Sequence, residues 1–112
     1  CLICGGMPEG EYVSGGMPVV MKGGLCYVKA EDGSTGTIAG SVLTLAKGVK
    51  NMVDWQIVTA EQAIRMATEV AARSAHIEER FAFIKPGRDA DLTVFNADMT
   101  LATAFVGGVE VK

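Results

Sequence analysis

Residues 32–53 read DGSTGTIAGSVLTLAKGVKNMV, and the spacing of their apolar residues changes at Ser41. From this point apolar side chains recur at the intervals that place them on one face of a helix. They are Val42, Leu45, Val49, Met52 and Val53. We therefore predict a helix that begins at Ser41, whose hydroxyl accepts a backbone N–H as the N-cap. Residues 31–36 are polar and predict a turn.

A β-hairpin is expected upstream of this helix. Residues 17–22 and 25–30 are rich in Val, Leu and Tyr, and Gly23-Gly24 separates the two runs. Two apolar runs joined by Gly-Gly are typical of a hairpin with a primed turn. Residues 1–10 contain three glycines and predict a loop.

A second helix is predicted from Thr59. Thr59 and Gln62 have the spacing of a capping box, in which each side chain binds the other residue's backbone N–H. The apolar face of this helix is mostly alanine, and comprises Ala63, Ile64, Ala67, Val70 and Ala71. Arg65, Glu69 and Arg73 follow one another at four-residue intervals and predict a solvated stripe of ion pairs.

Strand-like runs return after residue 80. They are residues 81–84, 92–95, 101–106 and 109–112. Pro86-Gly87 predicts a type II turn, and Gly107-Gly108 predicts a tight hairpin between the last two strands. The predicted fold class is therefore α+β, with a β-hairpin, two helices and a small antiparallel sheet.

Composition excludes several classes of protein. The chain has 112 residues with 49% hydrophobic and 21% charged residues, a balance typical of one small globular domain. Its net charge is −3, so it carries no basic surplus for nucleic acid. No apolar run approaches the roughly 20 residues of a membrane-spanning helix. We expect neither nucleic acid nor a membrane as a partner.

The cysteines and the single histidine limit the chemistry. Three cysteines, Cys1, Cys4 and Cys26, are an odd number, which argues against a secreted disulfide framework. A zinc site would need all three together with His76. We expect instead three reduced, partly buried thiols and a cytoplasmic protein. His76 follows a predicted helix and favours a role at the helix end.

One stretch resembles a known superfamily. Residues 86–95, PGRDADLTVF, resemble the C-terminal signature of the amidohydrolases. The resemblance implies a metal-dependent (β/α)8 barrel with a small β-sandwich that is built from both chain ends. On that basis residues 1–80 would be the end of the barrel, with its loop, hairpin and last helices. Residues 81–112 would be C-terminal strands of the sandwich.

A second set of motifs resembles the N-acetylglucosamine-6-phosphate deacetylase family. TIAGS at residues 37–41, LTL at residues 43–45 and GVKNMV at residues 48–53 carry the resemblance, with EQAIRMAT at residues 61–68 and VGG at residues 106–108. The resemblance runs along the whole chain, which would be about the last third of such an enzyme. Where that family has Asn-Pro-Ala-Arg, this chain has VAAR at residues 70–73, and two usual glycines appear as His76 and Ala82.

The resemblance implies hydrolysis of the acetamide of an amino-sugar phosphate, giving glucosamine 6-phosphate and acetate. The full-length enzyme would hold a divalent metal, zinc or iron, on His and Asp or Glu side chains from several strands. The proton-shuttling aspartate would lie immediately before Cys1. With His76 as the sole histidine, we predict no catalytic and no metal-ligating residue in this chain, and no activity of the 112-residue segment alone.

A contribution to substrate binding is expected. By the resemblance, the loop of residues 37–41 runs beside the amino-sugar phosphate, and Ile38, Ala39 and Gly40 contact it. Small residues let a main chain approach a ligand and present its N–H groups. Asp89 and Asp91 could be paired as an acid and a base, but their place after a Pro-Gly turn favours carboxylates that accept backbone N–H groups.

Two alternatives to this function stay open. One is another amidohydrolase, such as a dihydroorotase-like enzyme, and the other is a non-catalytic α+β module that binds a ligand or partner. The full-length enzyme is expected to be a homo-oligomer. The isolated segment is expected to self-associate, because helix faces and sheet edges suited to a barrel and a sandwich would be exposed.

Overall fold

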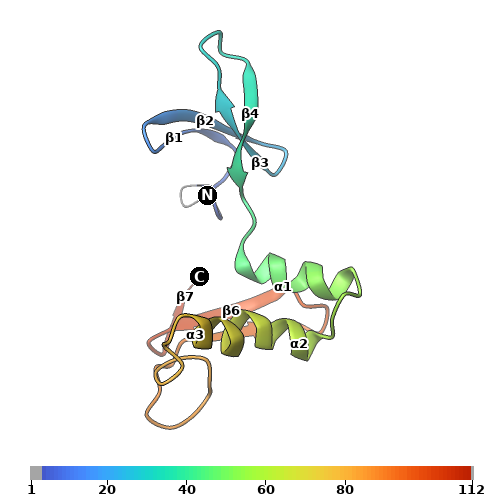
Figure 1. Ribbon diagram of the computed structural model, residues 1–112, viewed down its shortest axis with the longest axis vertical. Coiled ribbons are helices and arrows are strands. Elements are labelled where there is room, and N and C mark those ends of the chain that lie inside the picture. Colours follow the sequence, from blue (N-terminus) through green and yellow to red (C-terminus); the bar gives the residue numbers. More distant parts are fainter. Residues whose placement is uncertain (1–3, 112) are drawn as a thin grey trace. The chain divides into compact units, whose positions relative to one another are not determined.

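The computed structural model describes residues 4–111. The chain divides after Thr44 into two compact units, Cys1–Thr44 and Leu45–Lys112 (Figure 1). The first unit is a sheet, and the second combines helices with another sheet. The small antiparallel sheet and the helices of the predicted α+β class are present. The division at residue 80 concerns the domains of a whole enzyme and stays a prediction.

The first unit is a four-stranded antiparallel sheet in the order β1-β2-β3-β4. Its strands are β1 (Gly10–Ser14), β2 (Met17–Lys22), β3 (Leu25–Lys29) and β4 (Thr35–Ser41), coloured blue to teal in Figure 1. The predicted hairpin of β2 and β3 is confirmed. Gly23 and Gly24 both have positive φ, 61° and 74°, as a type I′ turn requires. The sheet adds β1 and β4, which the sequence did not predict.

Two predictions from the sequence are wrong: that a helix begins at Ser41, and that the polar turn extends to residue 36. Ser41 ends β4, and α1 (Leu45–Asp54) begins four residues later. The Ser41 hydroxyl does accept a backbone N–H, that of Leu43 at 3.0 Å, but outside the helix. Pairing with β3 draws Thr35–Ser41 into the sheet, because β-branched residues fit an extended edge strand. Val42 consequently packs on the core of the sheet.

The second helix begins as predicted. α2 (Ala60–Arg65) is capped by Thr59, whose side chain accepts the Gln62 N–H at 3.3 Å. The Gln62 side chain accepts the Thr59 N–H at 2.9 Å, which completes the capping box. Ion pairs join Glu69 to Arg65 at 3.1 Å and to Arg73 at 2.8 Å, so the charged stripe is also confirmed.

A π-helical turn changes the face that this helix buries. α2 continues into η1 (Met66–Val70) and then α3 (Ala71–Ser74). One wider turn shifts every later residue around the axis, since a π turn holds an additional residue. Ala72 is therefore buried instead of the predicted Ala71. Ala63 is buried as predicted, whereas Ile64 and Val70 are exposed at 37% and 55%.

The C-terminal sheet confirms three of the four predicted strands. Its strands are β5 (Leu92–Phe95), β6 (Leu101–Val106) and β7 (Val109–Val111), antiparallel in that order. Residues 81–84 form no strand, because Ala82 has a φ of 77° and interrupts any extended run there. The Pro86-Gly87 turn is confirmed by the Arg88 N–H, which donates to the Lys85 carbonyl at 3.2 Å.

Each unit has a small core of its own. In the first unit Cys4, Val19, Met21 and Cys26 form a buried cluster, with Tyr12 and Val42 against it. In the second unit Val49 of α1, Ala63 of α2 and Met99 form another, against which Phe95 of β5 packs. The helices of this unit thus cover one part of its sheet (Figure 1).

Candidate functional site

The predicted substrate residues lie on an edge strand instead of a loop. Ile38, Ala39 and Gly40 belong to β4, the last strand of the first sheet. The expectation of a loop at this point is therefore wrong. Ile38 is 58% exposed, Ala39 is exposed and Gly40 is half-buried. An edge strand offers backbone N–H and C=O groups on its outer side, so the change of conformation keeps the main chain available to a ligand.

A β-bulge interrupts the pairing of β4 at these residues. Cys26 of β3 pairs with Gly40, but the next residue, Tyr27, pairs with Ile38, which leaves Ala39 without an opposite residue on β3. A bulge kinks the strand and redirects its backbone groups, and bulges are common beside active sites. The sequence shows no direct signal of this bulge, because its register depends on pairing with a strand more than ten residues away.

Close approach of the backbones fixes the start of β4. A Cβ built on Gly36 would lie 2.9 Å from the Val28 carbonyl oxygen of β3, so a side chain does not fit there. The turn before β4 is held by Asp32, whose carboxylate accepts the Ser34 N–H at 2.9 Å. Hydrogen bonds from the Ser34 side chain and backbone lower the pKa of Asp32 below its ordinary value. The strand therefore begins at a rigid turn.

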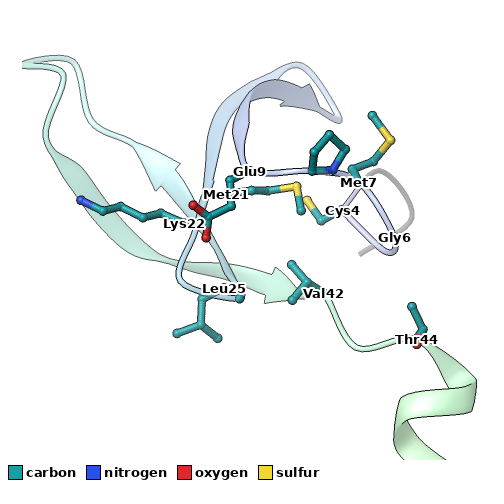
Figure 2. A pocket seen from close by; sticks show the side chains of 11 residues that line it. Cys4, Gly6, Met7, Glu9, Met21, Lys22, Leu25, Val42 and Thr44 are labelled. Atoms are coloured by element: carbon teal, nitrogen blue, oxygen red, sulfur yellow. The ribbon is translucent and has the colours of Figure 1, made fainter. Parts of the chain in front are cut away.

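A hollow of about 380 Å³ lies on the same unit (Figure 2). Its charged residues are Glu9 and Lys22, and the Glu9 carboxylate accepts the Gly23 N–H at 2.6 Å. The other lining residues are mostly small or apolar, and include Cys4, Met7, Met21, Leu25 and Val42. Because its carboxylate is already bound to the β2–β3 turn, Glu9 acts first as a structural residue.

Two of the three cysteines come together. Cys4, in the turn before β1, and Cys26 of β3 are both fully buried, and their sulfur atoms lie 2.9 Å apart. The hydrogen bond with Cys26, followed by burial, raises the pKa of the Cys4 thiol above its ordinary value. The sequence gave no sign of this pair, because the two cysteines are 22 residues apart and meet only through the fold of the sheet.

The zinc site of three cysteines and His76 finds no support. Cys1 lies outside the described residues, and His76 belongs to the other unit. Within residues 4–111, no group of three or more His, Cys, Asp or Glu side chains could hold a metal ion. His76 is exposed and ends the second helix, as the sequence predicted.

Asp89 and Asp91 have structural partners. The Asp91 carboxylate accepts the Gly107 N–H at 2.7 Å and so ties the β6–β7 hairpin to the start of β5. Asp89 accepts a hydrogen bond from Arg80 at 2.6 Å within an ion pair. The interpretation of Asp91 as a backbone-binding carboxylate is confirmed, while Asp89 pairs with a side chain. Neither arrangement is that of an acid and base pair.

Comparison with known proteins identifies the family. The model of the amidohydrolase family matches residues 24–111, more than half of the chain. The chain belongs to the amidohydrolase family. The region matched includes β4 and its bulge, both helices and the whole second sheet.

Relatives within the amidohydrolases are deacetylases of amino-sugar phosphates. The chain is 36% identical over 103 residues to the N-acetylglucosamine-6-phosphate deacetylase of Vibrio furnissii. The aligned region covers 92% of this chain and 25% of that enzyme. It is 31% identical, again over 103 residues, to the N-acetylgalactosamine-6-phosphate deacetylase of Escherichia coli O157:H7. The chain thus spans about a quarter of the length of these curated relatives.

Solved structures agree with the sequence relatives. The crystal structure of N-acetylglucosamine-6-phosphate deacetylase from Pasteurella multocida matches with a TM-score of 0.73 and 25% identity, over 96% of this chain and 27% of that one. The enzyme from Mycobacterium smegmatis, solved in complex with N-acetyl-D-glucosamine-6-phosphate, matches with a TM-score of 0.69 and 25% identity over 94% of this chain. Among the described residues, no helix has the length and apolar character needed to cross a membrane.

Proposed function

We propose that this chain is a C-terminal segment of an N-acetylglucosamine-6-phosphate deacetylase. The observation that carries the proposal is the 36% identity to the Vibrio furnissii enzyme over 92% of the chain. The fold agrees, since the Pasteurella multocida deacetylase matches 96% of the chain with a TM-score of 0.73. The whole enzyme would add water across the acetamide of the amino-sugar phosphate and release acetate and glucosamine 6-phosphate.

The segment contributes to substrate binding and leaves the chemistry to the rest of the enzyme. An amidohydrolase of this kind uses a divalent metal, zinc or iron, to supply a reactive water and polarise the acetamide carbonyl. The described residues do not fit such a metal, because they hold no cluster of three or more ligating side chains. In this proposal the catalytic residues and the metal ligands belong to another part of the enzyme, and the segment alone is inactive.

β4 is the part of the segment that contacts the substrate in this proposal. Its bulge at Ala39 and its position at the sheet edge leave the main chain of Ile38, Ala39 and Gly40 accessible. The exposed Ile38 side chain offers an apolar contact, and the N–H and C=O groups on the outer side offer hydrogen bonds to hydroxyl or phosphate oxygens. We place the whole enzyme in the cytoplasm as a homo-oligomer.

A deacetylase of N-acetylgalactosamine 6-phosphate is the second candidate. The chain is 31% identical over 92% of its length to the enzyme of that name from Escherichia coli O157:H7. The two substrates differ in the configuration of one hydroxyl group, so a few contacts decide between them. The 36% identity to a glucosamine-type enzyme favours the first candidate.

Acetate release by the whole enzyme tests the proposal. The full-length protein is incubated with N-acetylglucosamine 6-phosphate, N-acetylgalactosamine 6-phosphate or dihydroorotate, with and without a chelator. We expect acetate from the first substrate at the highest kcat/KM, loss of activity with the chelator, and no acetate from the 112-residue segment. Hydrolysis of dihydroorotate in place of both sugars would favour the dihydroorotase-like alternative, and no hydrolysis of any substrate would favour a binding module.

The role of β4 needs a separate variant. Ala39→Pro in the full-length enzyme removes one backbone N–H at the bulge, and Thr37→Ala, on the same exposed strand, is the matched control. We expect KM to rise about tenfold in Ala39→Pro, because the substrate loses about one hydrogen bond that involves a charged group. KM should stay unchanged in Thr37→Ala. An unchanged KM in Ala39→Pro with native circular dichroism would contradict substrate contact at β4.

A further inference from the structure

We propose that Cys4 and Cys26 are a redox modification site, at which a peroxide oxidises the two thiols to a disulfide. The site lies wholly within the first unit, and both thiols are free in this structure. The inference concerns the packing of the sheet and does not depend on the deacetylase function.

The distance between the sulfur atoms is the first argument. They lie 2.9 Å apart, and a disulfide has a bond of about 2.05 Å, so a shift of less than about 1 Å separates contact from bond. A metal bridge is a poorer fit. When two thiolates bind one tetrahedral zinc, each sulfur lies about 2.3 Å from the ion, and the two sulfur atoms are about 3.8 Å apart. Cys4 and Cys26 are too near one another for an ion to fit between them in that way.

The packing around the pair is the second argument. Val19 and Met21 of β2 enclose the two cysteines in one buried cluster, which holds the sulfurs in contact. Cys26 is fixed by its strand pairing with Met21 on one side and Gly40 on the other. The loop that a Cys4–Cys26 bond would close contains β1 and β2, so the bond joins the turn before β1 to the middle of the sheet.

The turn at Cys4 supplies the path for a small oxidant. Within residues 4–111, the backbone hydrogen bond that closes this turn runs from the Met7 N–H to the Cys4 carbonyl, and at 3.4 Å it is long. Gly5, Gly6 and Met7 are exposed, and Cys4 lies at the wall of the hollow (Figure 2). Opening of the turn uncovers Cys4 without breaking any pairing between strands, because the first pair of β1 is at Gly10.

The chemistry balances with one molecule of peroxide. In the opened turn Cys4 is no longer buried against Cys26, and its thiol loses a proton to water. The thiolate attacks one peroxide oxygen, so that the O–O bond breaks and a sulfenic acid and water result. The Cys26 sulfur then attacks the Cys4 sulfur, the S–O bond breaks, and a second water leaves. Two thiols lose two protons and two electrons, and hydrogen peroxide is reduced to two molecules of water.

Peptide mapping of the 112-residue chain tests the proposal. Cys1→Ser is used as the background, so that Cys4 and Cys26 are the two remaining cysteines. The folded protein is treated with hydrogen peroxide, quenched, unfolded, alkylated and digested with trypsin, which cleaves after Lys22 and Lys29. We expect a linked species of residues 1–22 and 23–29, two hydrogen atoms lighter than the free peptides, that a dithiol reductant separates again.

Matched variants and an internal control make the result decisive. Cys26→Ala in the same background should leave Cys4 unlinked, and the oxidised parent should unfold at a higher temperature than its reduced form. Met17, which is 52% exposed, reports through its sulfoxide that the peroxide reached the protein. Sulfoxide at Met17 with both thiols still open to alkylation would overturn the proposal, as would a lower unfolding temperature of the linked chain.

Discussion

Four non-glycine residues of the described chain have left-handed backbone conformations: Gln56, His76, Ala82 and Met99. Two of them, His76 and Ala82, are the positions at which the resemblance to the deacetylases implies glycine. Glycine adopts positive φ without steric cost, whereas other residues lose about 1 kcal/mol or more there. We therefore expect His76 and Ala82, both in the second unit, to lower its stability relative to glycine at the same positions.

His76 ends the second helix in a Schellman motif. Its N–H donates to the Arg73 carbonyl at 3.1 Å, and the Ile77 N–H donates to the Ala72 carbonyl at 3.0 Å. The residue between these bonds must turn left-handed, and His76 does so with a φ of 57°. This residue lies at a helix end, as the sequence predicted, but the single histidine of the chain serves as a turn residue here.

Replacing His76 by glycine should stabilise the protein. We expect the free energy of unfolding in urea to rise by about 1 kcal/mol, because the left-handed conformation no longer strains a side chain. Ser74→Gly, two residues earlier in the last helical turn, is the control and should lower stability by about 0.5 kcal/mol. A destabilised His76→Gly variant would show that the imidazole makes a contact worth more than the strain.

At the scale of elements, the sequence predicts those that depend on neighbouring residues and misses those that depend on pairing between distant residues. The capping box at Thr59 and Gln62 and the Gly-Gly hairpins depend on residues within four positions of one another, so the sequence shows them directly. β4 depends on pairing with β3, which draws Thr35 and Gly36 out of the predicted turn and overrides the apparent N-cap at Ser41. The bulge at Ala39 has the same origin, and so the conformation of the candidate substrate segment could not be predicted.

The π turn shows another limit of periodicity. Thr68 donates its hydroxyl hydrogen bond to the Ile64 carbonyl at 2.7 Å, one turn earlier. A side-chain donor at this carbonyl competes with the regular backbone bond and accompanies a local widening of the helix. Counting residues at a period of 3.6 places Ala63 and Ala67 correctly on the inner side of the helix, and after the π turn it fails by one position, at Ala72.

The β3–β4 pairing rests on Gly36, and its replacement by alanine tests this. The new Cβ would meet the Val28 carbonyl oxygen at 2.9 Å, so the two strands must separate. We expect a loss of about 1–3 kcal/mol in stability, measured by urea unfolding. Thr37→Ala, on the same exposed strand, is the control and should change stability by less than about 0.5 kcal/mol. Equal stability of the two variants would mean that β4 is not held closely to β3.

At the scale of the whole molecule, exposed large hydrophobic residues outnumber buried hydrophobic residues in the part of the chain that the structure describes. Eight hydrophobic residues of the described chain are buried, against nineteen large hydrophobic residues that are exposed. This ratio fits a segment whose faces are covered by other parts of a longer enzyme, in agreement with a chain that spans about a quarter of its relatives.

One apolar surface of the second sheet can be defined from its register. Val106 pairs with Val109, and Ala104 pairs with Val111, so these four side chains share one face of β6 and β7. Val106, Val109 and Val111 are 59%, 68% and 46% exposed. β7 is also an edge strand, whose free backbone groups are open to pairing with a second chain.

We therefore predict that the 112-residue chain self-associates through β7 and this valine face. Light scattering from about 1 to 100 μM should show a mass that rises with concentration, and Val109→Lys should return it to the monomer, since a buried lysine opposes pairing at the edge. Val13→Lys is the matched control, with the same charge change at a 62% exposed position of β1. Circular dichroism checks that both variants stay folded. A wild-type chain that is monomeric throughout this range would contradict self-association, and loss of association in Val13→Lys alone would place the contact on the first sheet instead.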